Sequence, residues 1–586
     1  MELLKHFKAL TLHPKNAQEL RGLILQLAIE GKLTSEWRRQ NPDIESASDL
    51  LKKIQEEKVR LVKLGKIRRT EEIQLAYNIY PKSKKPKKWK VVPLGNIVEI
   101  VRGVTFPSSE KSIIDSSENI PCLRTANVQE KVDWDDLIYV NRKFVKRDDQ
   151  ILRLGDVIMS MANSKELVGK VALIDNQMNR EYTLGGFISA IRPYKVDSNY
   201  LAFFLKAPST RTNLILSSSQ TTNIANISVG RLRPIEIPIP PIEEQKVIVH
   251  IVNQLFDEVN QLENLTQKRV QLKENWVTSA LRRLSQSQDT ELQRDWEMVQ
   301  QHLGTFFTEK TNVQKLRETI LQLAVQGKLT AHWRSIRQAQ EPPMEPASEL
   351  LTRIQKEKAR LVKEGKIRKE RTLPPILPEE VPFELPKGWV WCRFGELVKF
   401  MAYGTSQKTN DNDENVPVLR MGNITSKGQL TFGNLKYIPP DHKDLPKLYL
   451  DKYDLVFNRT NSYDLVGKSG VYFGEGFTYT LASYLIKVSL VMKFVDPVYI
   501  NNYINSMICR VTQINPQITA QTNQANFSGT KLRNILVPFA PLIEQKVIVE
   551  KVNGLMALCD RLEEQIELKN RVQEDWMKSC LKQVFS

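Results

Sequence analysis

The feature that most constrains the fold of this chain is that its first half recurs, in order, in its second half. The stretch LRGLILQLAIEGKLTSEWR at 20–38 returns as LRETILQLAVQGKLTAHWR at 316–334. A second stretch, ASDLLKKIQEEKVRLVKLGKIRR at 47–69, returns as ASELLTRIQKEKARLVKEGKIRK at 347–369. The offsets of 296 and 300 residues are far longer than a solenoid repeat, so the 586 residues are two tandem copies of one multi-element half.

Two of the three parts of each copy differ clearly in composition. Residues 1–80 and 311–385 are rich in Leu, Glu, Lys and Ala at helical spacing, which predicts pairs of helices. Residues 81–240 and 386–540 contain short runs of Val, Ile, Tyr and Phe broken by Gly, Asn, Asp and Pro, which predicts mixed domains dominated by strands and loops. The sequence therefore predicts an α+β chain of two tandem halves, each with one strand-rich domain.

The third part of each copy predicts a long helix, at 241–285 and 541–586. Both helices start at proline with acidic residues in the first turn, in PIPPIEEQ and APLIEQ. Apolar residues then recur at alternating spacings of three and four, which indicates a coiled-coil seam. The seam residues are Ile248, Val252, Leu255, Val259 and Leu262 in the first copy, and Ile548, Val552, Leu555, Cys559, Leu562 and Ile566 in the second. We expect the two helices to pair as an antiparallel coiled coil, with residues 286–310 as a linker; amphipathic helices packed on a domain are the alternative.

Charge and cysteine usage narrow the class of protein. The net charge of +18 and the pI of about 9.4 favour a polyanionic partner, although a ribosomal or membrane-surface protein has similar values. The five Cys are scattered without a Cys-x-x-Cys pair, so we expect no disulfide framework, no metal site and a reducing, cytoplasmic setting. No apolar run is long enough to span a bilayer, and the first residues lack the apolar core of a signal peptide.

The strand-rich domains match each other only at scattered polar anchors, whereas the helical segments match closely. One anchor is Asn-Ser-x-x-Leu-Val-Gly-Lys, at 163–170 and 461–468, and another is Thr-Asn-x-Ala-Asn-x-Ser, at 222–228 and 522–528. The Gly-Lys-Ser that closes the first anchor in the second copy is not a phosphate loop, because Ser462 stands where that motif requires glycine. A scaffold kept alike around two unlike domains indicates a device that presents two different readers.

Polar loops rich in Asn, Thr, Ser, Arg and Lys have the chemistry that DNA recognition requires. Arg bonds both acceptors of guanine and Asn or Gln pairs with adenine in the major groove, while Lys and Arg anchor phosphates. The expected DNA-binding residues of the first domain are Arg124, Asn127, Ser160, Asn163, Ser164, Lys165, Lys170, Thr222, Asn223, Asn226, Arg231 and Arg233. Those of the second are Arg420, Asn423, Asn458, Arg459, Thr460, Asn461, Ser462, Lys468, Thr522, Asn523, Asn526, Lys531 and Arg533. The alternative is that Asn and Ser only build turns, and we assign a structural role to Gly169 and Gly467.

The order of variable domain, PIPPIEEQ start, long helix, variable domain, PLIEQ start and long helix resembles the specificity subunit of Type I restriction-modification enzymes. The segments GKLT…ASELLTRIQKEKARL, LPKGWVWCRFGELV and NRTNSYDLVGKSGVYF also resemble that family. One departure is the helical segment that precedes the first variable domain and recurs before the second.

The resemblance implies a non-catalytic, sequence-specific DNA reader without a cofactor of its own. Each variable domain would be a target recognition domain for one half of a split, asymmetric DNA target, and the paired helices would set the spacing between the halves. The implied partners are double-stranded DNA, two methyltransferase subunits that use S-adenosylmethionine to methylate adenine, and motor-nuclease subunits that use ATP and Mg²⁺ to direct cleavage.

Two alternatives come from other functional classes. One is a stand-alone DNA methyltransferase or nuclease, but the sequence has no Asn-Pro-Pro-aromatic or Asp-Pro-Pro-aromatic motif, no complete phosphate loop and no repeated acidic-plus-Lys cluster. The other is a coiled-coil scaffold that binds only proteins, which leaves the divergent polar loops and the charge of +18 unexplained. Binding of a methyl donor by the purified chain would favour the first alternative, and failure to bind any duplex would favour the second.

Overall fold

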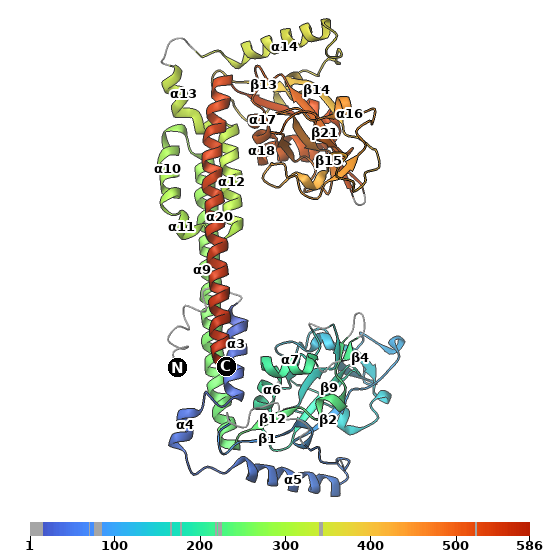
Figure 1. Ribbon diagram of the computed structural model, residues 1–586. Coiled ribbons are helices and arrows are strands. Elements are labelled where there is room, and N and C mark those ends of the chain that lie inside the picture. Colours follow the sequence, from blue (N-terminus) through green and yellow to red (C-terminus); the bar gives the residue numbers. More distant parts are fainter. Residues whose placement is uncertain are drawn as a thin grey trace. The chain divides into compact units, whose positions relative to one another are not determined.

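The computed structural model describes residues 16–69, 71–74, 85–164, 167–175, 178–216, 219–220, 225–338, 344–521 and 524–585. They fall into two compact units, one of residues 1–270 with 574–586 and one of residues 271–573. The unit boundaries lie inside two long helices, α9 (Ile242–Gln286) and α20 (Leu542–Phe585). Each unit combines helices with one strand-rich domain (Figure 1), so the expected fold class of two mixed helix-and-strand halves is confirmed.

The first unit has helices in the two predicted helical segments and three more, α6 to α8, inside the predicted strand-rich domain. They are α3 (Asn16–Ile29), α4 (Ser35–Gln40), α5 (Ala47–Lys63), α6 (Ser198–Lys206), α7 (Pro208–Leu216) and α8 (Val229–Leu232), followed by α9. At the first turn of α5, Asp49 Oδ2 accepts the backbone N–H of Ser46 at 3.1 Å and the Ser46 hydroxyl at 2.7 Å, as a capping carboxylate does. No helix within the described residues is both long and apolar enough to cross a membrane.

The first strand-rich domain is built from several small sheets. Its strands are β1 (Lys90–Pro93), β2 (Val98–Arg102), β3 (Asn119–Leu123), β4 (Ile138–Asn141), β5 (Val157–Ser160), β6 (Ala162–Asn163), β7 (Val171–Leu173), β8 (Thr183–Leu184), β9 (Ile188–Pro193), β10 (Ser219–Gln220), β11 (Ala225–Asn226) and β12 (Glu236–Ile239). The sheet orders are β2-β9-β5-β7, β4-β3-β8, β1-β12 and β10-β11-β6. Because β1 pairs with β12, the strand that enters the domain lies beside the strand that leaves it for α9.

The second strand-rich domain repeats this topology strand for strand. Its strands are β13 (Val390–Arg393), β14 (Val398–Tyr403), β15 (Val416–Leu419), β16 (Lys436–Ile438), β17 (Leu455–Asn458), β18 (Thr460–Asn461), β19 (Ser469–Val471), β20 (Thr480–Leu481), β21 (Leu485–Leu490), β22 (Thr519–Gln521), β23 (Gln524–Asn526) and β24 (Leu536–Phe539). The orders β14-β21-β17-β19, β16-β15-β20, β13-β24 and β18-β23-β22 match those of the first domain. The weak sequence match between the domains therefore conceals one shared framework.

The second unit contains two helices where a linker was expected. Residues 286–310 hold α10 (Asp289–Gln301) and α11 (Leu303–Phe306). They pack back on the end of α9, where Arg283 and Ser287 bond Asp295 and the rings of Trp276 and Phe306 stack at 4.2 Å. The remaining helices of this unit are α12 (Lys310–Val325), α13 (Ala331–Gln338), α14 (Ala347–Lys363), α15 (Phe394–Leu397), α16 (Leu445–Leu448), α17 (Pro497–Ile504), α18 (Met507–Cys509) and α19 (Gly529–Asn534), together with α20.

The predicted seam residues are buried or half-buried against the core of their own unit. Ile248, Val252 and Val259 of α9 belong to the same apolar cluster as Leu20 and Ile24 of α3. The corresponding residues of α20 share a cluster with the apolar face of α12 (Figure 1). Each seam therefore has a partner helix from the helical segment of its own copy, which the periodicity of the long helices alone does not reveal.

One buried carboxylate explains the acidic motif at the start of each long helix. Glu244 of α9 accepts hydrogen bonds from Thr34 Oγ1 at 2.7 Å, Arg38 Nη1 at 2.5 Å and Trp89 Nε1 at 2.8 Å. The side chain of Glu244 is completely buried. The contacts join the α3–α4 turn, the first strand of the domain and the long helix.

The same carboxylate clamp recurs in the second copy. Glu544 accepts from Thr330 Oγ1 at 2.7 Å, Arg334 Nε at 2.9 Å and Trp389 Nε1 at 2.8 Å. The glutamine next to it, Gln545, accepts from the backbone N–H of Asp496 at 2.8 Å. The clamps fix each strand-rich domain to its helices, so the EEQ and IEQ motifs are structural.

Candidate nucleic-acid interface

The structure brings the two predicted polar anchors of each domain together in one small sheet. In the first domain β6, which carries Asn163, pairs with β11, which carries Asn226, and Ala225 lies opposite Asn163. In the second domain β18 pairs with β23 in the same way, with Thr460 opposite Asn526. The anchors lie some 60 residues apart in the sequence, and each domain forms a single polar sheet from them.

Arg459 lies between a strand of the four-stranded sheet and a strand of the polar sheet in the second domain. It follows β17 and precedes β18, and its backbone bonds both Tyr484 and Phe527, which fixes the strand on either side. Its guanidinium lies 4.8 Å from the ring centroid of Tyr403, and Nη1 donates to the carbonyl of Ser483 at 3.3 Å. Stacking on an aromatic ring holds the planar fork of donors in one orientation, as bidentate recognition of guanine requires.

The position that matches Arg459 in the first domain is Met161. Its backbone makes the same two bonds, to Phe187 and Ile227, but its side chain is buried and apolar. The framework at this position is therefore shared, while the side chain offered for recognition is not. At this position the second domain therefore carries a guanidinium, and the first carries a buried thioether.

Asn163 and Ser164 are half-buried, and in the second domain Asn461 is half-buried while Ser462 is exposed. The side-chain oxygen of each Asn accepts the backbone N–H of the following Ser at 2.8 Å, which shapes the loop after the strand. Asn226 is exposed and Asn526 is half-buried. The remaining predicted residues of these loops, Lys165, Thr222, Asn223, Thr522 and Asn523, lie outside the described residues.

Two predicted base readers build turns inside the protein instead. Asn127 is fully buried; its Oδ1 accepts the N–H of Arg124 at 2.7 Å, and its Nδ2 donates to the carbonyls of Asp133 and Asp136 at 2.9 Å. Asn423 makes the corresponding three bonds at 2.8 to 3.0 Å. With every polar atom of the amide in use, neither side chain is accessible to DNA. The prediction for Asn127 and Asn423 was wrong.

Three further predicted readers are buried in the sheet core. Ser160 at the end of β5 and Asn458 at the end of β17 have at most 1% of their surface exposed. Thr460 is 6% exposed and donates to Asn526 Oδ1 at 2.6 Å. Burial leaves these three side chains almost no surface for DNA, so the expectation of DNA contact for them was also wrong.

The predicted phosphate anchors Lys170 and Lys468 lie in clefts beside the helices. Lys170 Nζ donates to Gln129 Oε1 at 2.7 Å and lines a cleft of about 1130 Å³ that also includes Arg21 of α3. Lys468 lines a smaller cleft of about 300 Å³ together with Arg510. Burial lowers the pKa of the Lys468 ammonium below its ordinary value, and the charge of Arg510 adds to this shift.

The other predicted cations are largely engaged within their domains. Arg124 pairs with Asp136 at 2.6 Å, and Arg420 Nη2 donates to the carbonyl of Asn434. Lys531 Nζ donates to the carbonyl of Gln517 at 2.6 Å. Arg533 pairs with Glu370, whereas Arg231 is exposed on α8 and Arg233 is half-buried, with Nη2 3.5 Å from the carbonyl of Glu71.

The sequence model of the Type I restriction modification DNA specificity domain matches this chain twice, at residues 86–274 and 386–572. The chain belongs to that specificity family. The two matches cover more than half of its length and coincide with the two strand-rich domains and the helices that follow them. These domains are therefore its target recognition domains.

Individual relatives agree with the family assignment over almost the whole chain. The EcoAI specificity subunit of Escherichia coli is 30% identical over 577 residues, which is 95% of this chain and 92% of the relative. The EcoEI specificity subunit of Escherichia coli is 29% identical over 579 residues, with the same coverage. One chain of a solved structure concerned with complex assembly and conformational transition of the type I R-M system has the same fold, with a TM-score of 0.51, 14% identity and coverage of 85% of this chain and 98% of that one.

Sequence reasoning missed aromatic residues at the target recognition sheets. Phe187 and Tyr484 occupy matching positions before β9 and β21 and are 69% and 42% exposed. Tyr403, the platform under Arg459, is 48% exposed and accepts the N–H of Gly529 through its hydroxyl at 2.9 Å. The sequence signal for Phe187 and Tyr484 is a Tyr-Thr-Leu-x-x-aromatic motif that occurs in both copies. It reads YTLGGF at 182–187 and YTLASY at 479–484.

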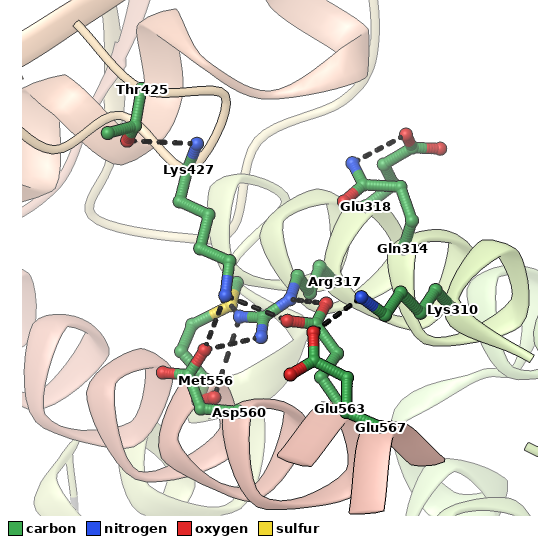
Figure 2. A network of polar contacts seen from close by, with 10 residues as sticks. All are labelled: Lys310, Gln314, Arg317, Glu318, Thr425, Lys427, Met556, Asp560, Glu563 and Glu567. Carbon is green, nitrogen blue, oxygen red and sulfur yellow. Dashed lines mark hydrogen bonds and ion pairs between the residues drawn. The ribbon is translucent and has the colours of Figure 1, made fainter. Parts of the chain in front are cut away.

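A network of ion pairs seats the second target recognition domain on α20 (Figure 2). Lys427 of that domain donates to Asp560 at 2.7 Å and to Glu563 at 2.8 Å. Arg317 of α12 reaches the same two carboxylates, at 2.6 Å and 3.3 Å. The hydrogen bond from Lys427 lowers the pKa of Asp560 below its ordinary value. The domain, the repeated helical segment and the long helix thus meet at one charged cluster.

The first unit has a reduced version of this cluster. Arg21 of α3 donates to Asn260 and Glu263 of α9, both at 2.7 Å, and lies 3.9 Å from Glu130 of the target recognition domain. Among the described residues, no group of three or more His, Cys, Asp and Glu is arranged to hold a metal ion.

Proposed function

We propose that this specificity subunit is a non-catalytic DNA reader that recognises a split, asymmetric target through its two target recognition domains. The observation that carries the proposal is that both domains build the same polar sheet but equip it differently, with Arg459 in one and Met161 in the other. Equal frameworks with unequal reading residues are what two different half-sites require.

The shared scaffold supports a fixed separation between the half-sites. Each domain is clamped to its helices by a buried carboxylate and packs into the same apolar core as the long helix that follows it. We infer that α9 and α20 also run alongside each other as an antiparallel pair that acts as a spacer between the readers. Their seams already pack on α3 and α12, so the spacer would be a helical bundle and not a two-stranded coiled coil.

The chemistry would belong to the partners. The EcoAI and EcoEI relatives are specificity subunits of Type I restriction enzymes. We propose that this chain assembles on duplex DNA with two methyltransferase subunits that use S-adenosylmethionine to methylate adenine. Motor-nuclease subunits that use ATP and Mg²⁺ would join them for cleavage, and the chain itself would hold no cofactor and act in the cytoplasm.

The experiment is to express the chain with its neighbouring methyltransferase gene and to map methylated adenines across a bacterial genome. The proposal predicts methylation at one bipartite motif, with two different defined halves and an undefined spacer of constant length. The methyltransferase expressed alone is the control and should leave the motif unmodified. Methylation at a continuous motif, or methylation that does not depend on this chain, would contradict the proposal.

A further inference from the structure

A basic turn follows the last helix of each repeated helical segment, which is α5 in the first copy and α14 in the second. Five exposed positions of α5 and α14 and of the turns after them carry a positive charge in both copies. They are Arg60, Lys63, Lys66, Arg68 and Arg69 in the first copy and Arg360, Lys363, Lys366, Arg368 and Lys369 in the second. Other exposed positions of the same helices changed between the copies, such as Lys52 to Thr352, Glu56 to Lys356 and Leu64 to Glu364.

Core packing does not explain why these charges recur, because the side chains are exposed. The residues that pack α5 on its unit are Ala47, Leu50 and Ile54, and their counterparts in α14 are identical. The exposed neighbours that changed show that the surface of this segment tolerates substitution. Arg60 pairs with Glu57 in its own helix, Arg360 with Glu357 and Glu364, and Lys366 with Glu364. For the other recurring cations, the exposed charge indicates a ligand of opposite charge.

The turn is built rigidly in both copies. Gly65 has a φ of +65° and ends α5, and the N–H groups of Gly65 and Lys66 bond the carbonyls of Val62 and Leu61. This is the pattern of a glycine-capped helix end, and Ile67 packs against the unit's core just beyond it. Gly365, with a φ of +71°, makes the same arrangement. The cations that follow are thus presented from a fixed backbone.

The first turn borders a groove that is also lined by an arginine close in sequence to the predicted reading strand. Lys66 and Arg68 line a groove of about 720 Å³ with Arg147, Arg153 and Arg233. The acidic residues of the same groove are Glu99, Asp148 and Asp149, so cations predominate. Arg233 lies seven residues after Asn226, at the far end of α8 from the predicted reading strand β11. A short run of chain, from β11 through α8 to Arg233, therefore links the reading sheet to the groove that the basic turn lines.

The second copy has the corresponding arrangement. Arg368 and Lys369 line a groove of about 610 Å³ with Arg371 and Arg393, opposed by Glu370 and Glu396. Arg533, which follows the reading strand β23 through α19, pairs with Glu370 at the edge of this groove. The same three features, a capped turn, its cations and an arginine from the reading loop, occur in both halves.

We propose that the basic turns 60–69 and 360–369 are sequence-independent DNA contacts that bind the phosphate backbone of the duplex read by the adjoining target recognition domain. This inference rests on the proposed function and adds to it a second contact surface outside the reading sheet. Cations of this kind neutralise phosphates and release counterions, so each contact contributes affinity without base preference. The alternative ligand is an acidic protein surface, and measurements of DNA binding and of co-purification with the methyltransferase distinguish the two.

The test measures binding of the full-length chain to a fluorescein-labelled 40-base-pair duplex of random sequence by anisotropy, between 50 and 200 mM NaCl. The variant carries Lys66→Gln, Arg68→Gln and Arg69→Gln. A matched control carries Lys52→Gln, Lys246→Gln and Lys268→Gln, which removes the same charge from exposed positions of α5 and α9.

The proposal predicts a smaller salt dependence for the turn variant and not for the control. Each lost phosphate contact lowers the slope of log K against log salt by about 0.9, so that three lost contacts reduce the affinity change across this fourfold salt range by about 40-fold. Discrimination between the methylated motif and random duplex should stay unchanged, because no base contact is lost. The variant should still direct methylation to the parent motif.

Three results would overturn the proposal. An unchanged slope of log K against log salt in the turn variant would show that the turn does not contact DNA. An equal decrease of this slope in the control would show that only net charge matters. Normal DNA binding combined with failure to co-purify with the methyltransferase would assign the turn to an acidic protein surface. If the parent chain directs methylation to a bipartite motif in these experiments, the proposed function stands whatever the turn variant shows.

Discussion

Replacement of Glu544 by alanine should loosen the second target recognition domain from α20. The carboxylate is completely buried, and the Arg334 side chain that it pairs with is only 10% exposed. The change leaves a buried guanidinium without its counter-charge and also removes the acceptor of Thr330 and Trp389. Breaking a buried ion pair by removal of one partner costs about 3–5 kcal/mol. At 1.4 kcal/mol per tenfold, that corresponds to a local opening constant about 10²- to 4 × 10³-fold larger.

Hydrogen exchange measured by mass spectrometry suits this prediction, because two units of this size need not unfold in one cooperative step. Peptides that cover 327–336 and 542–549 should exchange about 10²- to 4 × 10³-fold faster in the Glu544→Ala variant. The first copy supplies the internal control. Arg38 is 22% exposed, so water can partly replace the lost carboxylate, and Glu244→Ala should cost about 2 kcal/mol.

A double variant separates the ion pair from the packing around it. Addition of Arg334→Met to Glu544→Ala removes the stranded charge, so protection should recover in part. Protection that falls less than tenfold in Glu544→Ala would refute the view that the buried carboxylate clamps the domain to the helix. A double variant that exchanges faster than Glu544→Ala would assign the loss to packing instead.

Four further predictions concern base reading, the stability of one turn, and spacing. Arg459→Ala should relax selectivity at one base pair, at a cost of about 1–3 kcal/mol against the preferred base, in a competition assay with single-position duplex variants; an equal loss on every sequence would make it a phosphate contact. Tyr484→Ala should weaken binding by about 1–3 kcal/mol if the exposed ring stacks on a base, whereas wild-type affinity would remove it from the interface. Asn423→Ala should destabilise its turn by about 1–3 kcal/mol, measured by hydrogen exchange, because three buried hydrogen bonds are lost. Insertion of four helix-forming residues between Leu262 and Gln271 lengthens α9 by about 6 Å and should favour a methylated motif with one or two extra spacer base pairs. An unchanged DNA spacer in an active variant would contradict the proposal that this helix sets the distance between the readers.

The duplication made the overall organisation predictable, because two copies reveal which segments are kept and which diverge. Strand-rich domains and long helices follow from periodicity and turn residues in the sequence. The partner of each helix seam was not predictable in this way. Apolar residues at spacings of three and four pack equally well on a distant long helix or on α3 and α12, and only the fold decides between them.

The candidate site was predictable in its segments but not in its individual residues. Asn127 and Asn461 look alike in sequence, yet the first is buried in a turn and the second lies on a loop of the reading sheet. A two-residue strand such as β18 has no periodicity, so its pairing with β23 some 60 residues later leaves no sequence signal. Tyr403 was missed for a similar reason, because stacking of its ring under Arg459 joins two strands that are remote in the chain.

The most direct test of the account is an exchange of one reader. Residues 90–240 would be replaced by the matching domain of a relative with a known target, with the clamp residue Glu244 retained, and methylated adenines would be mapped in the presence of the methyltransferase. The account predicts that one half of the bipartite motif changes to that of the donor, while the other half and the spacer length stay the same. A change in both halves, or a new spacer length, would contradict two independent readers on one fixed scaffold.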